Sequence, residues 1–267
     1  SLVNALIDAP VSAVDDDIAT AARLEIGFAD PPAARRWWRP TDGDDGAVVD
    51  APIPVGEAAA ASTDPATRMV RVGIPRRLLA RGVVLVDTPG VGGIGSANAL
   101  VTASTLGEAH AVLFVTDVSQ ELTAAEASAL VDATRRCRHV VLVETKTDLY
   151  PHWRTIVDTD RGHLDDLGLS IPIVPVSNQL RSMALRANDS DLNAESGFPR
   201  LIELITGEML GSASEIVAAG ADHAIRRISA QLRDPLVREL EVLEQGHDDG
   251  PARAAIDAAR NEVAELR

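Results

Sequence analysis

The sequence predicts an α/β protein: a doubly wound, mostly parallel sheet followed by long α-helices. The first observation behind this prediction is a set of four short runs that are apolar throughout, at 83–86, 111–115, 140–143 and 171–176. A strand without polar alternation is buried on both faces, as in a parallel sheet that helices cover. The second observation is the helical patterns among these runs, near 98–107, 123–136, 151–167 and 178–187. Such alternation is typical of a doubly wound sheet.

The chain ahead of these runs is less regular. Residues 1–7 place their apolar side chains on one face and predict a helix. Apolar residues alternate at 24–28, which predicts a strand, and another strand is expected at 69–74. Much of the chain's Pro, Gly and Asp falls in 29–66, so we expect long loops there with at most short edge strands.

The last part of the chain predicts helices only. Residues 198–210 show one helical pattern, and from 212 to 245 apolar residues recur at helical spacing with charges between them. A further helix is expected from Pro251 onward. We therefore expect an α/β domain at 1–207 and a second, helical domain that starts at 208 and runs to 267.

The composition excludes several classes of function. The chain of 267 residues carries a formal net charge of −15, and an acidic surface repels phosphate backbones, so we expect no nucleic-acid partner. Three Trp, one Tyr and three Phe are too few for a base-stacking platform or an aromatic membrane belt. The single cysteine, Cys137, excludes an internal disulfide. No apolar run is long enough to suggest a membrane span.

The first polar cluster, Asp87-Thr88-Pro89-Gly90, directly follows a predicted buried strand. In open α/β sheets, ligands bind at the carboxyl ends of the strands. An Asp in that place can hold Mg²⁺, and a Gly three residues later can bring its backbone N–H against a terminal phosphate, because it has no side chain. This pattern is common, and a plain strand-to-helix turn stays open as the alternative.

The second cluster is Thr145-Lys146-Thr147-Asp148, which follows another predicted buried strand. A carboxylate can accept hydrogen bonds from both N1–H and the exocyclic amine of guanine, a pair that adenine cannot supply. Of the 25 basic residues, 24 are Arg, and the one Lys stands where its stem can lie along a base. The alternative is a solvated charge pair at the start of a helix.

The third cluster is Ser177-Asn178, after the last of the four apolar runs. Its loop can offer backbone N–H groups to the guanine carbonyl, although a serine that caps a helix is the default interpretation. The three clusters stand in order at successive strand ends. Together they predict a fold that binds GTP or GDP with Mg²⁺.

Thr20 is the remaining candidate, in the loop before the strand at 24–28. A threonine there can reach Mg²⁺ and use its backbone to hold the attacking water when a γ-phosphate is present. Loop threonines are common, so a plain loop residue stays open as the alternative.

At these motifs the chain resembles the bacterial dynamin-like GTPases, whose fold belongs to the P-loop class. The resembling segments are SLVNALI at 1–7, DDDIATA at 15–21, VDTPGVGGIG at 86–95, TDVSQELT at 116–123, ETKTDLYPHWRTIV at 144–157 and ESGFPRLIELI at 195–205. Of these, DTPGVGG and TKTDLYPHWR are specific, and the others are supportive.

The resemblance implies a large GTPase that hydrolyses GTP with Mg²⁺. The matching residues are Thr20 in the first switch, Asp87 and Gly90 in the second switch, Thr145, Lys146 and Asp148 in the guanine-specifying loop, and Ser177 and Asn178 in the last base-contacting loop. Thr20 is thereby implied as the catalytic residue, and Thr20 and Asp87 as the residues that hold the metal. Val91 stands where small GTPases carry a water-orienting Gln, so catalytic help from head-to-head dimerisation is implied.

The resemblance also implies partners and a location. The expected partners are further copies of the chain, through the GTPase domain and a stalk that begins at 208, and a paralogous dynamin-like protein. A lipid membrane would be contacted through a region outside this chain. The implied location is cytoplasmic, at the inner face of the cell membrane.

The chain departs from the family pattern in one respect, because it contains no G-x-x-x-x-G-K-[ST] phosphate loop. In such proteins the segment at 1–7 follows that loop. We therefore expect residues 1–207 to be a GTPase domain without its first strand and phosphate loop, inactive as given. Loss of a central strand would leave two unpaired strand edges. The alternative is a non-catalytic pseudo-GTPase module that pairs with an active dynamin-like partner.

Overall fold

The computed structural model describes residues 1–14, 22–40, 48–88 and 109–209. The chain divides into two units, Ser1–Gly211 and Ser212–Arg267, and all described residues belong to the first. The helices predicted at 98–107, at 212–245 and from Pro251 onward lie outside the described residues, and so does the expected stalk from residue 210 onward.

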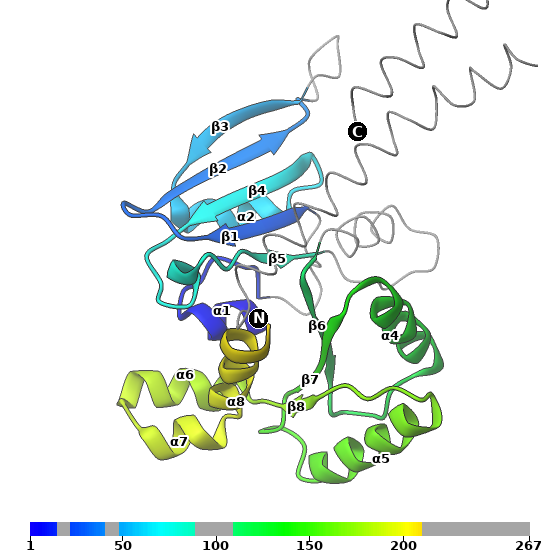
Figure 1. Ribbon diagram of the computed structural model, residues 1–267. Helices are drawn as coiled ribbons and strands as arrows, with labels where there is room; N and C mark the ends of the chain where they lie inside the picture. The colour runs from blue at the N-terminus through cyan, green and yellow to red at the C-terminus, as the bar shows by residue number, and fades with distance from the viewer. Residues whose placement is uncertain (15–21, 41–47, 89–108, 210–267) are drawn as a thin grey trace, which may run out of the picture. The chain divides into compact units, whose positions relative to one another are not determined.

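The first half of the described chain forms a five-stranded mixed sheet in the order β3-β2-β4-β1-β5 (Figure 1). Strands β1 and β4 are parallel, and the other neighbours are antiparallel. The strands are β1 (Arg23–Gly27), β2 (Ala33–Trp38), β3 (Val49–Ile53), β4 (Thr67–Gly73) and β5 (Leu85–Asp87). The strands predicted at 24–28 and 69–74 are thus confirmed.

The expectation of loops with edge strands at 29–66 was wrong in part. Strand β2 lies inside the sheet, between β3 and β4, and the helix α2 (Ala58–Thr63) packs against it. The prolines misled the prediction because they stand where strands tolerate them: Pro31 and Pro32 precede β2, and Pro52 lies in the edge strand β3.

The second half forms a parallel three-stranded sheet in the order β6-β7-β8. Its elements are β6 (Ala111–Asp117), α4 (Ala124–Arg136), β7 (His139–Thr145), α5 (Trp153–Asp166), β8 (Ile173–Pro175), α6 (Asn178–Ala187), α7 (Ser190–Glu195), α8 (Phe198–Glu203) and the π-helix η3 (Leu204–Glu208). The three later apolar runs are therefore parallel strands, as predicted. The first run differs, because β5 joins the other sheet and is antiparallel to β1.

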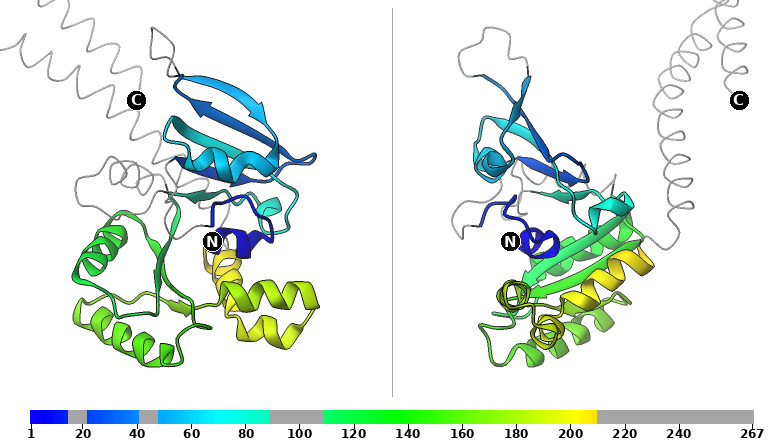
Figure 2. Two further views of the ribbon diagram at one scale, coloured as in Figure 1. Left: turned by 180° about the vertical axis from the view of Figure 1, so that it is seen from behind. Right: turned by 90° about the vertical axis from the view of Figure 1, so that its left-hand side faces the viewer.

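Helices cover both faces of the three-stranded sheet (Figures 1 and 2). Alternate residues of β7 point to opposite sides. Val140 and Leu142 pack into a cluster with Leu130 of α4 and Leu164 of α5. Their neighbours in the strand, Val141 and Val143, belong to a different cluster. Because the side chains of β7 alternate between two clusters and helices cover both faces of the sheet, the doubly wound α/β domain is confirmed.

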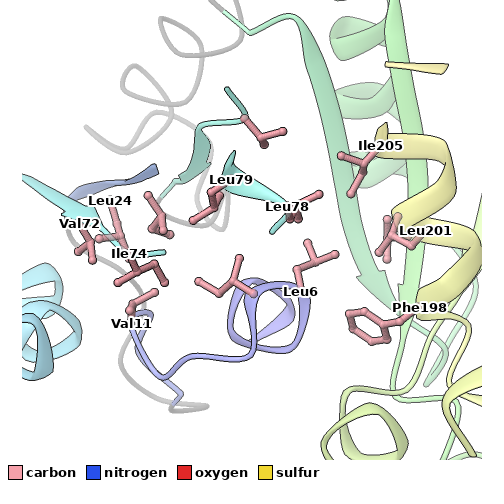
Figure 3. Close-up of a cluster of buried hydrophobic side chains, with 14 of the residues drawn as sticks. Leu6, Val11, Leu24, Val72, Ile74, Leu78, Leu79, Phe198, Leu201 and Ile205 are labelled. Atoms are coloured by element: carbon pink, nitrogen blue, oxygen red, sulfur yellow. The ribbon is translucent and has the colours of Figure 1, made fainter. Parts of the chain in front are cut away.

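The cluster that contains Val141 and Val143 is the larger hydrophobic core, and it includes buried side chains from both sheets. Figure 3 shows Leu6 of α1 (Leu2–Ile7) between side chains of the five-stranded sheet, such as Leu24 and Val72, and Phe198 and Leu201 of α8. The short 3-10 helices η1 (Val55–Glu57) and η2 (Leu79–Arg81) complete the described elements. Burial of these side chains is the main stabilising contribution of the domain.

Strand β5 lies at one edge of the five-stranded sheet, and β6 lies at one edge of the three-stranded sheet. No described strand pairs with the outer side of β5 or of β6. Strand β6 carries apolar residues on both faces, yet its side chains are only partly buried, and Val115 is 48% exposed. The neighbouring strand β7 is buried at all but one position. Leu85 of β5 and Leu113 of β6 pack against the same core cluster. Both edges thus resemble interior strands that lack a neighbour.

Gly197 generates a prediction about stability. It has a φ of +76°, and a Cβ there would lie 2.1 Å from the carbonyl oxygen of Pro175. We expect Gly197→Ala to lower the free energy of unfolding by at least about 2 kcal/mol, because it combines a left-handed residue with a backbone clash. Urea unfolding measures the change.

Gly162, within α5, is the matched control because a Cβ there meets no atom within 4 Å. Gly162→Ala should raise the free energy of unfolding by about 0.5–1 kcal/mol, since alanine favours a helix. Equal effects of the two substitutions would contradict the close approach at Gly197.

Candidate functional site

The carboxyl ends of β6, β7 and β8 lie at one edge of the parallel sheet, and the two predicted guanine loops follow β7 and β8. The buried hydroxyl of Thr145 donates to the carbonyl of Thr116 at 2.8 Å. The backbone N–H of Thr147 donates to the carbonyl of Val176 at 3.5 Å. The loop 145–148 is therefore tied to both neighbouring strands.

Asp148 and Ser177 come together at this edge. The hydroxyl of Ser177 donates to Asp148 Oδ1 at 2.5 Å, and it also accepts the N–H of Leu180 at 3.0 Å as the N-cap of α6. Ser177 is fully buried, whereas Asp148 is exposed to solvent. The capping interpretation of Ser177 is correct, and the same hydroxyl orients a carboxylate that a ligand can reach.

Asn178 follows directly, at the first position of α6. Its Oδ1 atom is buried and has no hydrogen-bond partner in the described part of the chain. A buried acceptor without a partner costs free energy, and such atoms occur where a water or a ligand completes the site. Asn178 thus keeps an unpaired acceptor directly after Ser177 in the chain.

Lys146 has a left-handed backbone, with a φ of +63°, and its Nζ lies 2.8 Å from Asp117 Oδ2. Burial opposes ionisation of Asp117, but hydrogen bonds from Lys146 and Ser119 and the lysine charge outweigh it and lower the pKa of that carboxyl. Sequence reasoning missed Asp117. The available signal was its position, since it ends β6 as Thr145 ends β7.

Asp87 belongs to a separate cluster, at the end of β5. It is half-buried, and its Oδ2 accepts a hydrogen bond from the hydroxyl of Ser12 at 2.7 Å. Burial raises the pKa of the Asp87 carboxyl, although the bond from Ser12 lowers it. No hydrogen bond in the described chain joins Asp87 to the loops that follow β7 and β8.

Asn4 of α1 holds Ser12 in place. Its Oδ1 accepts the backbone N–H groups of Val11 at 3.0 Å and Ser12 at 2.9 Å, and its Nδ2 donates to the Ser12 carbonyl at 2.7 Å. The chain after α1 is thereby folded back so that its serine meets Asp87. Sequence reasoning missed both residues, because Asn4 and Ser12 show no motif that links them to a position 75 residues away.

The donor set around Asp87 suits a magnesium ion. Mg²⁺ keeps several waters and is bound by one or two carboxylates together with phosphate oxygens. Asp87 presents one carboxylate of that kind, and the Ser12 hydroxyl is a second oxygen beside it, 2.7 Å from Asp87 Oδ2. Thr20 and Gly90, the other predicted residues of this part of the site, lie outside the described residues.

A second pair that sequence reasoning missed is Glu144 and Asp160. Glu144 of β7 is fully buried, and Asp160 of α5 is 1% exposed. Burial raises the pKa of Glu144 to about 8, helped by the charge of Asp160 and a hydrogen bond to it, whereas Arg161 lowers the value. Asp160 Oδ1 also accepts the N–H of Leu122 at 2.8 Å.

The described residues contain no helix long and apolar enough to cross a membrane. They also contain no group of three or more His, Cys, Asp and Glu that could hold a metal ion.

Comparisons with known proteins show which family the chain belongs to. Residues 1–146 match the model of the Dynamin family. Isoniazid-induced protein IniA of Mycobacterium tuberculosis, in strains CDC 1551 / Oshkosh and H37Rv, is 38% identical over 251 residues. The match covers 91% of this chain and 38% of the IniA protein, so the chain spans well under half the length of these curated relatives.

Solved structures agree at the level of the fold. Two structures of a bacterial dynamin pair, described as oligomerised and as sensing and tethering membranes, superpose with TM-scores of 0.61 and 0.60 at 16% identity. They match 99% of this chain and 45% and 43% of theirs. The similarity of sequence and fold leads to one conclusion: the chain belongs to the dynamin family.

Proposed function

We propose that this chain binds guanine nucleotides and that, in the complete protein, it hydrolyses GTP with Mg²⁺ to drive self-assembly and membrane remodelling. The observation that carries the proposal is the exposed carboxylate of Asp148, held by the buried hydroxyl of Ser177 beside Lys146. Membership of a family of GTPases supports a hydrolase in general.

Base selection follows from the carboxylate. Asp148 accepts the N1–H and the exocyclic amine of guanine, and the bond from Ser177 fixes its orientation before the base arrives. Adenine presents an acceptor at N1 and would leave the carboxylate unpaired. Lys146 lays its stem along the base, while Asp117 holds the ammonium group at the edge of the site.

Hydrolysis requires the residues around Asp87. In our proposal Asp87 and Thr20 would hold Mg²⁺, which would supply positive charge at the phosphates when bound. The backbone of Thr20 holds the attacking water, and the N–H of Gly90 donates to the γ-phosphate. Water adds to the γ-phosphorus and gives up a proton to an oxygen of the γ-phosphate, the bond from the γ-phosphorus to the β-phosphate oxygen breaks, and GDP and inorganic phosphate leave. Ser12 and Asn4 support this end of the site by holding Asp87 in place.

The phosphate-binding part of the site needs one more strand. We propose that residues 1–207 are a dynamin GTPase domain from which the first strand and the phosphate loop are missing. The two unpaired edges of β5 and β6, and the exposed apolar Val115 on β6, support a strand between them. Such a strand would join both sheets and bury the half-exposed faces of their edges.

Assembly, membrane contact and location are proposed from the relatives. The similar bacterial dynamin pair is described as oligomerised and as tethering membranes. We propose that this protein assembles with copies of itself through the GTPase domain and a stalk that starts at 208, or with a paralogous dynamin-like partner. Lipid would be contacted outside this chain, at the cytoplasmic face of the cell membrane.

Asp148→Asn tests the guanine site. An amide in place of the carboxylate loses the bond from the exocyclic amine of guanine but can donate to the extra carbonyl of xanthine. We expect the affinity for GTP to fall about 10- to 100-fold and the affinity for xanthosine triphosphate to rise. Equilibrium binding of both nucleotides to the full-length protein measures this. Asp165→Asn, an exposed change on α5, is the control and should leave both affinities unchanged.

Thr20→Ala tests the hydrolytic role. In the full-length protein we expect the rate of GTP hydrolysis to fall at least about 10-fold while the affinity for GTP changes little. The reason is that the attacking water is no longer positioned by Thr20. Single-turnover hydrolysis and equilibrium binding separate the two effects. Thr63→Ala, a change at a partly exposed threonine of α2, is the control. Normal turnover by Thr20→Ala would show that another residue holds the water.

The same assays distinguish the alternative function. A full-length protein that binds GTP selectively but releases no phosphate, alone or with a dynamin-like partner, would be a pseudo-GTPase interaction module. A protein without preference for guanine would contradict both readings of the site.

A further inference from the structure

We propose that Glu144 and Asp160 share one proton and thereby position the guanine-binding loop 145–148, so that guanine-nucleotide affinity falls when this proton is lost. The inference rests on the proposed function, since it concerns the same loop. Neither carboxyl group touches the base edge; both act as positioning residues.

Glu144 stands directly before the loop. It is the sixth of the seven residues of β7, and its backbone carbonyl accepts the N–H of Val176 at 2.8 Å. Its side chain continues the row formed by Val140 and Leu142 and faces α5, where an apolar residue would be expected. A carboxyl group in this place costs free energy, which suggests a role other than packing.

Asp160 connects three elements at this point. It belongs to α5, contacts Glu144 of β7, and accepts the backbone N–H of Leu122 in the segment before α4. The segment begins at Asp117, which holds Lys146. The pair of carboxyls therefore links α5 to the end of β7 and to the segment that follows β6.

A single proton between Glu144 and Asp160 gives their unpaired oxygens a hydrogen bond. Both carboxylate oxygens of Glu144 and the Oδ2 of Asp160 are buried and have no hydrogen-bond partner in the described chain. A protonated Glu144 can donate to Asp160, while the ionised Asp160 accepts the N–H of Leu122. Two ionised carboxylates in contact would instead repel each other in a medium that screens charge poorly.

The surroundings keep this proton in place near neutral pH. Among the described residues, the charged groups that act on Glu144 are Asp160 and Arg161, both on α5. Beside Glu144 in the sheet, β6 offers Thr116 and β8 offers Pro175, neither of which is charged. Burial and Asp160 raise the pKa of Glu144 to about 8, so the pair loses its proton just above physiological pH.

Loss of the proton would loosen the loop. A second negative charge would push α5 away from the end of β7. The hydrogen bond from Leu122 to Asp160, which ties α5 to the segment before α4, would be displaced as well. Two backbone bonds report on the loop itself: Thr147 N–H to Val176 O, and Leu149 N–H to Lys146 O. Both should open more often when Glu144 is ionised.

The test measures GDP affinity of the full-length protein from about pH 6.5 to about pH 9.5, in the wild type and in Glu144→Gln. Glutamine keeps a donor toward Asp160 and cannot ionise. We expect wild-type affinity to fall about 10-fold more than that of the variant across this range. Guanine loses its own N1 proton in alkaline solution, but this affects both proteins equally and cancels in the comparison. Asp165→Asn is the control and should follow the wild type.

A second measurement works without nucleotide. Hydrogen exchange of the amides of Thr147 and Leu149, corrected for the intrinsic effect of pH, should show protection that decreases with pH in the wild type and stays constant in Glu144→Gln. Asp160→Asn, which gives an ionised Glu144 an amide donor, should also flatten the profile and replaces Glu144→Gln if that variant does not fold.

The outcomes separate the two proposals. Parallel pH profiles of wild type and Glu144→Gln, in affinity or in exchange, would overturn the positioning role. Failure of the wild type to prefer GDP over ADP at neutral pH would overturn the proposed function, and the exchange measurement would then still decide whether the pair orders the loop.

Discussion

Strand β7 is the constraint on which the rest of the domain depends. Its alternate residues face two hydrophobic clusters, one with α4 and α5 and one with α1 and α8, so its register is fixed from both sides. A slip by one residue would exchange the two faces. Because β7 cannot slip, the residues beyond its end are fixed as well, and Lys146 and Asp148 reach the same edge as Ser177.

Much of this arrangement could be predicted from the sequence. Three of the four apolar runs without alternation became the parallel strands β6, β7 and β8, because that composition is typical of strands covered on both faces, whereas the first run became the antiparallel β5. Polar residues at the strand ends led us to expect Asp148 and Ser177 at one edge of the sheet, where their side chains do meet, since parallel strands place their carboxyl ends together. Strand β2 was not predicted, because its prolines lie just outside it and the partner strands that stabilise it are distant in sequence.

The contacts that tune the site could not be predicted. Ser12 meets Asp87 only because Asn4 folds the intervening chain back, and this depends on three hydrogen bonds rather than on a pattern. In the sequence Glu144 is only the polar residue that follows an apolar run. Its partner Asp160 lies on α5, and the sequence does not show which face of that helix packs on the sheet. Such pairs arise from tertiary packing, which periodicity does not specify.

The left-handed conformation of Lys146 has a consequence for how this loop can change. Glycine would adopt that backbone without the steric penalty of about 1–2 kcal/mol that other residues incur. Glycine has no ammonium group, however, so a substitution that relaxes the turn would also abolish the pairing with Asp117. Folding stability and ligand recognition therefore favour different amino acids at this position, and a residue kept there for recognition weakens the fold.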